Sequence, residues 1–318
     1  MLHVVAGAAR SPFKKVPRDA ASVGLASPRL VRKGVVLDPG KVAAYARLCG
    51  YEGAAPVPLP YPHLLGFPLA MRIMAARDFP LPLLGLVHTG IEVTQRRALS
   101  PAERVDVAVY AEGVRGHRRG VEVVMVTEVR GEGVGEPVWV SRSTYLARAG
   151  GGDGAEAGAG TGVARSRAGR PLARPFRPLG AAPSPKGTER QEAEPKGAGR
   201  QEAVPKGAGG GVEWVLDGDL GRRYGRVSGD LNPIHLHPLT ARLFGFPKAI
   251  AHGMWTFARC VAEAQLPEVV SVRAEFRAPV LLPTRVTYVR LPDNGFALRG
   301  SRDGRPHLTG TASTDLGR

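Results

Sequence analysis

Between residues 224 and 238 the chain reads Tyr-Gly-Arg-Val-Ser-Gly-Asp-Leu-Asn-Pro-Ile-His-Leu-His-Pro. Asp230 and His235 stand five residues apart, too far to share one helix face, and Pro233 between them excludes a helix. We therefore predict an ordered loop in which a carboxylate and an imidazole converge on one small molecule. Such a pair around a water molecule is what general acid/base chemistry on that water requires.

A second feature lies seventeen residues beyond His235, where His252-Gly253 opens an apolar stretch that predicts a helix over 253–264. A glycine at a helix N-terminus exposes a backbone N–H, which together with the helix dipole can hold a carbonyl oxygen as it gains negative charge. Asn232 adds an amide that can orient the acid/base pair. Base, acid and oxyanion donor together favour addition or loss of water beside a thioester carbonyl.

The surrounding sequence shows one pattern twice. Toward the C-terminus, a short helix over 219–227 and the apolar helix precede four strand-like runs, at 269–278, 285–291, 296–302 and 307–313. Earlier in the chain, a short helix begins after Asp38-Pro39, and a helix over 67–76 precedes runs at 86–97, 104–114, 121–129 and 138–146. A helix followed by an antiparallel meander predicts an α+β design, and two copies predict a pseudo-dimer.

These residues resemble a known family. Ser228-Gly-Asp-Leu-Asn-Pro-Ile-His235, with Ala251-His-Gly-Met254 downstream, looks like the hydratase motif of the MaoC-like dehydratases, which are hot-dog folds. The stretches 45–51, 59–71 and 85–89 look like the degenerate N-terminal hot dog of the same proteins. The chain thus resembles the double hot-dog 3-hydroxyacyl-thioester dehydratases of actinobacterial type, which are related to eukaryotic (R)-specific enoyl-CoA hydratase 2. The expected fold is an α+β double hot dog, each half a sheet wrapped around a central helix.

The resemblance also implies a reaction and a site. Asp230 and His235 are then the catalytic pair, Asn232 orients them, and the Gly253 N–H takes the thioester oxygen. The implied reaction of fatty acid metabolism is reversible syn hydration of a trans-2-enoyl thioester to the (R)-3-hydroxyacyl thioester, on CoA or acyl-carrier protein. It needs no metal or redox cofactor. The N-terminal copy lacks the motif, so we predict one active site per chain, with that copy's helix lining the acyl tunnel.

Other residues are weaker candidates for substrate binding. Two positively charged residues, Lys248 and Arg277, could reach CoA phosphates, although solvated surface charge is the alternative for both. The candidates nearer the motif are Tyr224, Pro233, His252 and Met254.

The same residues allow three alternatives to the dehydratase. His237 and His252 could join the catalytic pair in a zinc site, but the spacing of a zinc protease is absent. Ser228 lacks the Gly-x-Ser-x-Gly context of a hydrolase nucleophile. The alternative function is a non-catalytic module that binds an acyl thioester or an acyl-carrier protein.

Composition sets the domain boundaries. Residues 150–211 hold 16 Gly and 7 Pro among 62 positions and predict a disordered linker. It separates an N-terminal hot dog at 35–149 from a catalytic one at 212–318, and a basic arm occupies 1–34. The net charge is +16, but the arm holds seven Lys or Arg against one Asp, and the linker ten against six acidic residues. A solubilising role is therefore favoured over nucleic-acid binding.

Two cysteines, Cys49 and Cys260, cannot form a disulfide framework or a four-thiolate zinc site. No run approaches 18 apolar residues and no export signal precedes the first domain, so we predict a cytoplasmic protein without a membrane span. The expected partner is an acyl-CoA or acyl-carrier-protein thioester, and the pattern allows either a monomer or a homodimer.

Overall fold

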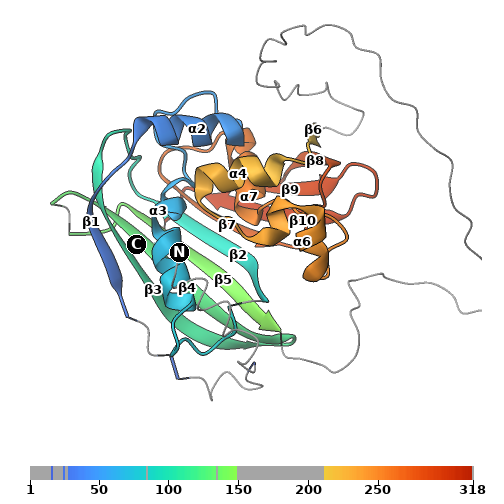
Figure 1. The fold of residues 1–318 in the computed structure, drawn as a ribbon. Helices are drawn as coiled ribbons and strands as arrows, with labels where there is room; N and C mark the ends of the chain where they lie inside the picture. The colour runs from blue at the N-terminus through green and yellow to red at the C-terminus, as the bar shows by residue number, and fades with distance from the viewer. Residues whose placement is uncertain are drawn as a thin grey trace, which may run out of the picture. The chain divides into compact units, whose positions relative to one another are not determined.

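The computed structural model describes residues 16, 24–25, 28–83, 85–133, 135–148 and 211–316. They form a ten-stranded antiparallel sheet in the order β1-β3-β4-β5-β2-β7-β10-β9-β8-β6 (Figure 1). The N-terminal strands are β1 (Leu30–Val36), β2 (Leu86–Gln95), β3 (Arg104–His117), β4 (Gly120–Gly131) and β5 (Trp139–Arg148). The C-terminal strands are β6 (Val212–Leu216), β7 (Val270–Phe276), β8 (Thr284–Leu291), β9 (Gly295–Gly300) and β10 (Pro306–Ser313).

The two halves of the sheet meet where β2 pairs with β7. Val93 lies opposite Val272 at this junction, and the pairing runs from Gly90–Glu275 to Gln95–Val270. Read outward from the junction, β2-β5-β4-β3-β1 repeats the order of β7-β10-β9-β8-β6. The halves are therefore related by an approximate two-fold axis, which confirms the predicted α+β class and its duplicated design.

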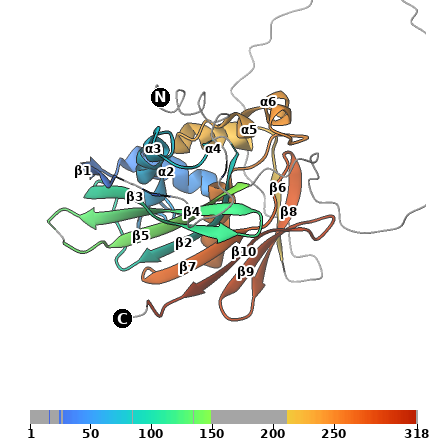
Figure 2. The same cartoon turned by 90° about the horizontal axis from the view of Figure 1, so that it is seen from below.

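The helices gather on one face of the sheet (Figure 2). Those of the N-terminal half are α2 (Pro39–Cys49) and α3 (Pro62–Met74), and those of the C-terminal half are α4 (Leu220–Ser228), α5 (Pro233–Leu236), α6 (Pro238–Leu243) and α7 (Gly253–Ala264). Helix α7 is apolar on most sides and buries Trp255, Phe257 and Val261, as expected of a central helix rather than a surface one. Its bounds match the predicted helix over 253–264.

Some boundaries differ from the prediction. Helix α3 begins at Pro62 rather than at residue 67, because a proline fits the first helical position, where its missing N–H would have no partner. Strand β1 was not predicted, since its residues are mostly exposed and carry no apolar alternation. It begins inside the range assigned to the basic arm. The predicted linker, apart from Gly211, lies outside the described residues.

Both cysteines are buried and unpaired. Among the described residues, no helix combines the length and the hydropathy needed to cross a membrane.

Candidate active site

Two glycines of α4 allow the motif to pack closely against this helix. A Cβ atom at Gly221 would lie 1.9 Å from the carbonyl oxygen of His235, and one at Gly225 would lie 2.8 Å from that of Asp230. Neither distance is compatible with a side chain. After Ser228 the chain leaves the helix through Gly229 in the left-handed conformation, with φ of 78°. The sequence Gly-x-x-x-Gly thus lets the loop that carries Asp230 and His235 pack directly on α4.

Helix α5 corrects the expectation that Pro233 excludes a helix. Pro233 occupies the first position of a one-turn helix, where no N–H is needed, and Asn232 is its N-cap. The Asn232 side-chain oxygen accepts a hydrogen bond from the Ile234 N–H at 3.3 Å. The Asn232 N–H in turn donates to Asp230 Oδ1 at 3.1 Å. Asn232 therefore orients Asp230 through its main chain, while its amide holds the helix that carries His235.

His235 is buried, with 8% of its surface exposed. Its Nδ1 lies 2.8 Å from the carbonyl oxygen of Ile250. A carbonyl oxygen only accepts hydrogen bonds, so Nδ1 carries a proton and Nε2 is the lone-pair nitrogen of the neutral ring. The ring is thus fixed in the tautomer that leaves Nε2 free to accept a proton.

His252 completes a compact cluster with Asp230 and His235. Its Nε2 lies 3.1 Å from the main-chain oxygen of Asp230 and 3.7 Å from Asp230 Oδ2. Its ring stacks on that of His235, with centroids 3.6 Å apart and planes 23° apart. Side-chain N and O atoms of the three residues all lie within 4.8 Å of one another. The structure therefore brings together the predicted pair and a second imidazole.

Burial sets the protonation of this cluster. It raises the pKa of Asp230 above its usual value, against the opposing effects of His235 and the Asn232 N–H. Burial lowers the pKa of His235, opposed by Asp230, and lowers that of His252 well below its usual range, assisted by the charge of His235. Two neutral imidazoles thus face a carboxyl group that ionises less readily than in water. Displaced pKa values of this kind suit proton exchange with a substrate.

The N-terminus of α7 faces the same cluster. Gly253 directly follows His252 and is the first residue of α7, where helix N–H groups have no partner within the helix. A Cβ at Gly253 would lie 3.2 Å from the Phe276 ring, so this position is tightly packed. The arrangement fits the predicted role of the Gly253 N–H as an oxyanion donor. Met254 lies half-buried in the same helical turn.

The cluster also contains the atoms of a metal site, but its geometry favours proton transfer. The lone pairs of an imidazole lie in the ring plane. Because the His235 and His252 rings are stacked face to face, their lone pairs run side by side rather than toward one centre. A tetrahedral ion needs converging ligands. His237 lies apart as the exposed N-cap of α6, where its Nδ1 accepts from the Leu239 N–H at 3.1 Å.

The weaker candidates differ in burial and in their partners. Tyr224 is buried, and its ring centroid lies 4.9 Å from that of His252, so Tyr224 packs against the cluster. Pro233 and Lys248 are exposed. Arg277 is exposed and pairs with Glu275 at 2.5 Å, which agrees with the alternative that it is a surface charge.

The N-terminal half contributes residues that were not predicted as part of the site. His88 packs on Phe276, with ring centroids 4.8 Å apart, and Phe276 in turn packs on Gly253. The charge of Asp230 helps to raise the pKa of Tyr145, after burial. These neighbours come together through the β2–β7 junction, for which the sequence holds no local signal.

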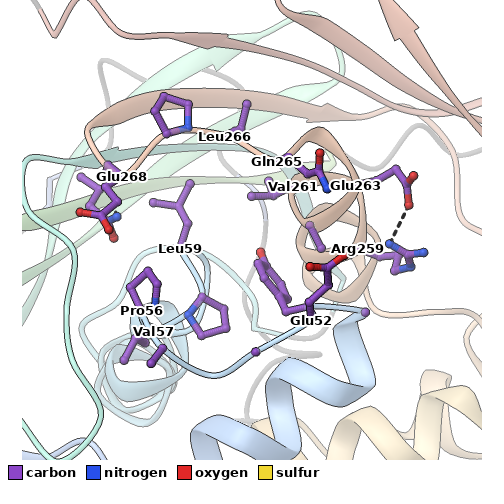
Figure 3. Close-up of a pocket in the computed structure, with 18 of the residues that line it drawn as sticks. Glu52, Pro56, Val57, Leu59, Arg259, Val261, Glu263, Gln265, Leu266 and Glu268 are labelled. Atoms are coloured by element: carbon purple, nitrogen blue, oxygen red, sulfur yellow. Dashed lines mark hydrogen bonds and ion pairs between the residues drawn. The ribbon is translucent and has the colours of Figure 1, made fainter.

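A pocket of about 440 Å³ occupies the other end of this junction (Figure 3). Here Gln95, at the end of β2, faces the start of β7, and the walls come from the loop after α2 and the end of α7. The pocket is therefore the two-fold counterpart of the cluster around Asp230. Its lining includes Glu52, Glu263 and Glu268 but no histidine, so it has no carboxylate–imidazole pair.

Comparisons with known proteins agree with this geometry. Residues 216–294 match the family model described as a MaoC like domain. The chain is 36% identical over 281 residues to 3-hydroxyacyl-thioester dehydratase X of Mycobacterium tuberculosis, covering 86% of this chain and 85% of the relative.

Solved structures show the same relationship. The crystal structure of HtdX from M. tuberculosis matches with a TM-score of 0.65 and 30% identity, over 90% of this chain and 99% of that one. A MaoC-like dehydratase of Phytophthora capsici has the same fold, with a TM-score of 0.62 at 16% identity, over 93% of this chain and 98% of that one. The chain belongs to the MaoC-like dehydratases, a family of hydro-lyases, and has their double hot-dog fold.

Proposed function

We propose that the chain interconverts trans-2-enoyl thioesters and (R)-3-hydroxyacyl thioesters by reversible syn addition of water, as a hydro-lyase of fatty acid metabolism. The observation that carries the proposal is the convergence of Asp230, His235 and His252 within 4.8 Å, beside the N-terminus of α7. The name of the M. tuberculosis relative, a 3-hydroxyacyl-thioester dehydratase, supports the same reaction.

The chemistry follows from the two proton-carrying side chains. In hydration, Asp230 and His235 take a proton from a water molecule as its oxygen bonds to C3, and they return a proton to C2. In dehydration, C2 loses the proton and the C3 hydroxyl leaves as water. Both groups act from the same side of the substrate, so addition is syn. The Gly253 N–H stabilises the thioester oxygen while negative charge develops on it.

The carrier and the setting are also proposals. CoA and acyl-carrier protein both present the thioester that this site needs, and Lys248 lies exposed in the segment that leads to His252. Two buried free thiols suit a reducing compartment such as the cytoplasm. The chain already contains two hot dogs, so catalysis requires no second copy, and a homodimer is compatible with it. The reaction uses acid, base and an oxyanion donor, so we propose no cofactor.

The second candidate function is a module that binds the thioester without turnover. The displaced pKa values of Asp230 and His235 favour catalysis, because binding a neutral enoyl group does not need a carboxyl and an imidazole in contact.

The test is the loss of enoyl-thioester absorbance with two acyl groups, crotonyl and a medium-chain trans-2-enoyl group. Each is supplied both as the CoA thioester and as the acyl-carrier-protein thioester. We expect turnover, with the (R)-3-hydroxyacyl thioester as product. Formation of the (S)-product would contradict the proposal. Binding without turnover on all four substrates would also contradict it and would establish the binding module.

A further inference from the structure

Three aromatic rings form a row across the junction between the halves. Tyr145 on β5 lies directly opposite His88 on β2, and their rings stack with centroids 4.6 Å apart and planes 16° apart. The His88 ring contacts that of Phe276 on β7 at 4.8 Å. The row thus runs from the N-terminal half into the catalytic half.

Both ends of the row reach the catalytic residues. At one end, the Phe276 ring packs on Gly253 at the start of α7. At the other end, burial raises the pKa of Tyr145, and the charge of Asp230 adds to this rise. Tyr145 is half-buried, and Ser143 is the other polar side chain that acts on its hydroxyl. The ring contacts and this effect on the pKa together place a protic group of the N-terminal half in the neighbourhood of Asp230.

We propose that Tyr145 contacts the substrate: its hydroxyl donates a hydrogen bond to the oxygen at C3, which is the attacking water in hydration and the departing hydroxyl in dehydration. The proposal rests on the proposed dehydratase function. Tyr145 keeps its proton throughout, because Asp230 and His235 carry out the proton transfers. Its part is to hold the oxygen between the two halves of the site.

The electrostatics of the row suit a neutral donor. Burial, and then the charge of Asp230, raise the pKa of Tyr145, so its hydroxyl stays protonated over the working range of an enzyme. Burial lowers the pKa of His88 to about 3 and that of His63, which stacks 6.3 Å from His88, to about 4. No cation of the row then competes with the tyrosine for Asp230. The stacked imidazole holds the phenol ring in place without taking its hydrogen bond.

The test variant is Tyr145→Phe, which keeps the ring and its stacking and removes only the hydroxyl. One lost hydrogen bond predicts a fall in kcat/KM of about threefold to tenfold, with most of the change in kcat. A saturated acyl-CoA has no oxygen at C3, so its inhibition constant should stay unchanged. Tyr110→Phe is the matched control, since Tyr110 hydrogen-bonds Glu128 at 2.9 Å away from the site and should leave all these values unchanged.

Two results would overturn the inference. One is a Tyr145→Phe enzyme with the kcat/KM of the wild type. The other is a Tyr145→Phe enzyme in which binding of the saturated acyl-CoA weakens by as large a factor as turnover slows. That result would mean a general change in the shape of the site. An inactive wild type would instead remove the proposed function, so the two failures are distinguishable.

Discussion

The two halves of the molecule contain an equivalent helix and turn but use them for different purposes. Helices α2 and α4 lie in equivalent places, and the ring centroids of Tyr45 and Tyr224 are 6.2 Å apart. Each helix ends at a glycine in the left-handed conformation, Gly50 in α2 and Gly229 in α4. The positions of Gly221 and Gly225 are taken in α2 by Val42 and Ala46, both buried.

This difference decides where the following loop can go. In the catalytic half, the absence of two side chains lets the backbone of Asp230 and His235 lie against α4. In the N-terminal half, Val42 and Ala46 fill that space with core packing. The residues after the turn differ accordingly: Asp230 follows Gly229, whereas Tyr51 follows Gly50.

The two sites lie at opposite ends of helix α7. The cluster around Asp230 lies at the N-terminus of α7, where partial positive charge favours an oxyanion. The pocket around Glu52 receives the C-terminal end of α7, whose carbonyl groups on Glu263 and Ala264 accept hydrogen bonds from Arg290. Under the proposed function, the C-terminal half catalyses and the N-terminal half supplies walls and support.

Removing the imidazole should have the largest effect. His235→Ala should lower kcat/KM by about 10²–10⁴-fold, because it removes a general acid/base group. His237→Ala, two residues away and outside the cluster, should stay near wild-type activity. Steady-state kinetics on an enoyl thioester provide the comparison, and equal losses in both variants would mean that the loop matters only for folding.

Exchanging equivalent residues between α4 and α2 tests whether the loop must pack closely on α4. Gly225→Ala places a Cβ against the Asp230 carbonyl and should displace that residue, with a loss of activity on the order of 10²-fold for a shift near 1 Å. The strain should also cost about 1–3 kcal/mol of stability.

The reverse exchange, Ala46→Gly, serves as the matched control. It should cost about 0.5–1 kcal/mol through helix propensity and leave kcat/KM intact. Urea unfolding and kinetics on both variants decide the matter. A fully active Gly225→Ala enzyme would show that the close approach is dispensable.

A smaller effect concerns stability. The pKa of Asp230 is higher in the folded protein than in the unfolded chain. The folded state therefore loses stability as pH rises from the unfolded pKa to the folded one, and the penalty is absent below the unfolded value. Asp230→Asn should therefore raise Tm at neutral pH, on the order of a few °C.

The gain should shrink as pH falls toward about 4, the ordinary value of an aspartate. Calorimetry at several pH values measures it. A Tm that drops on substitution at neutral pH would show that Asp230 stabilises the fold.

Local patterns in the sequence account for the repeated elements and for the Asp230–His235 motif. Helix α7 was predicted to its end residues, because Trp255, Phe257 and Val261 follow a helix-starting His-Gly. Edge strand β1 was not predicted, since few of its side chains are buried.

The resemblance predicts that a helix of the N-terminal half lines the acyl tunnel, but nothing in the sequence predicts that strand residues of this half lie near the site. His88 and Tyr145 reach it only through pairing between strands about 180 residues apart, as in the contact of Val93 with Val272. No local periodicity encodes such a contact.

The most direct test of the division of labour compares two substitutions at equivalent positions. Hydration of an enoyl thioester by Asp230→Asn and by Tyr51→Phe would be measured beside the wild type, with circular dichroism to verify folding. The account predicts a fall of about 10²–10⁴-fold for Asp230→Asn and no change beyond about twofold for Tyr51→Phe. A folded Asp230→Asn enzyme with wild-type turnover would contradict it.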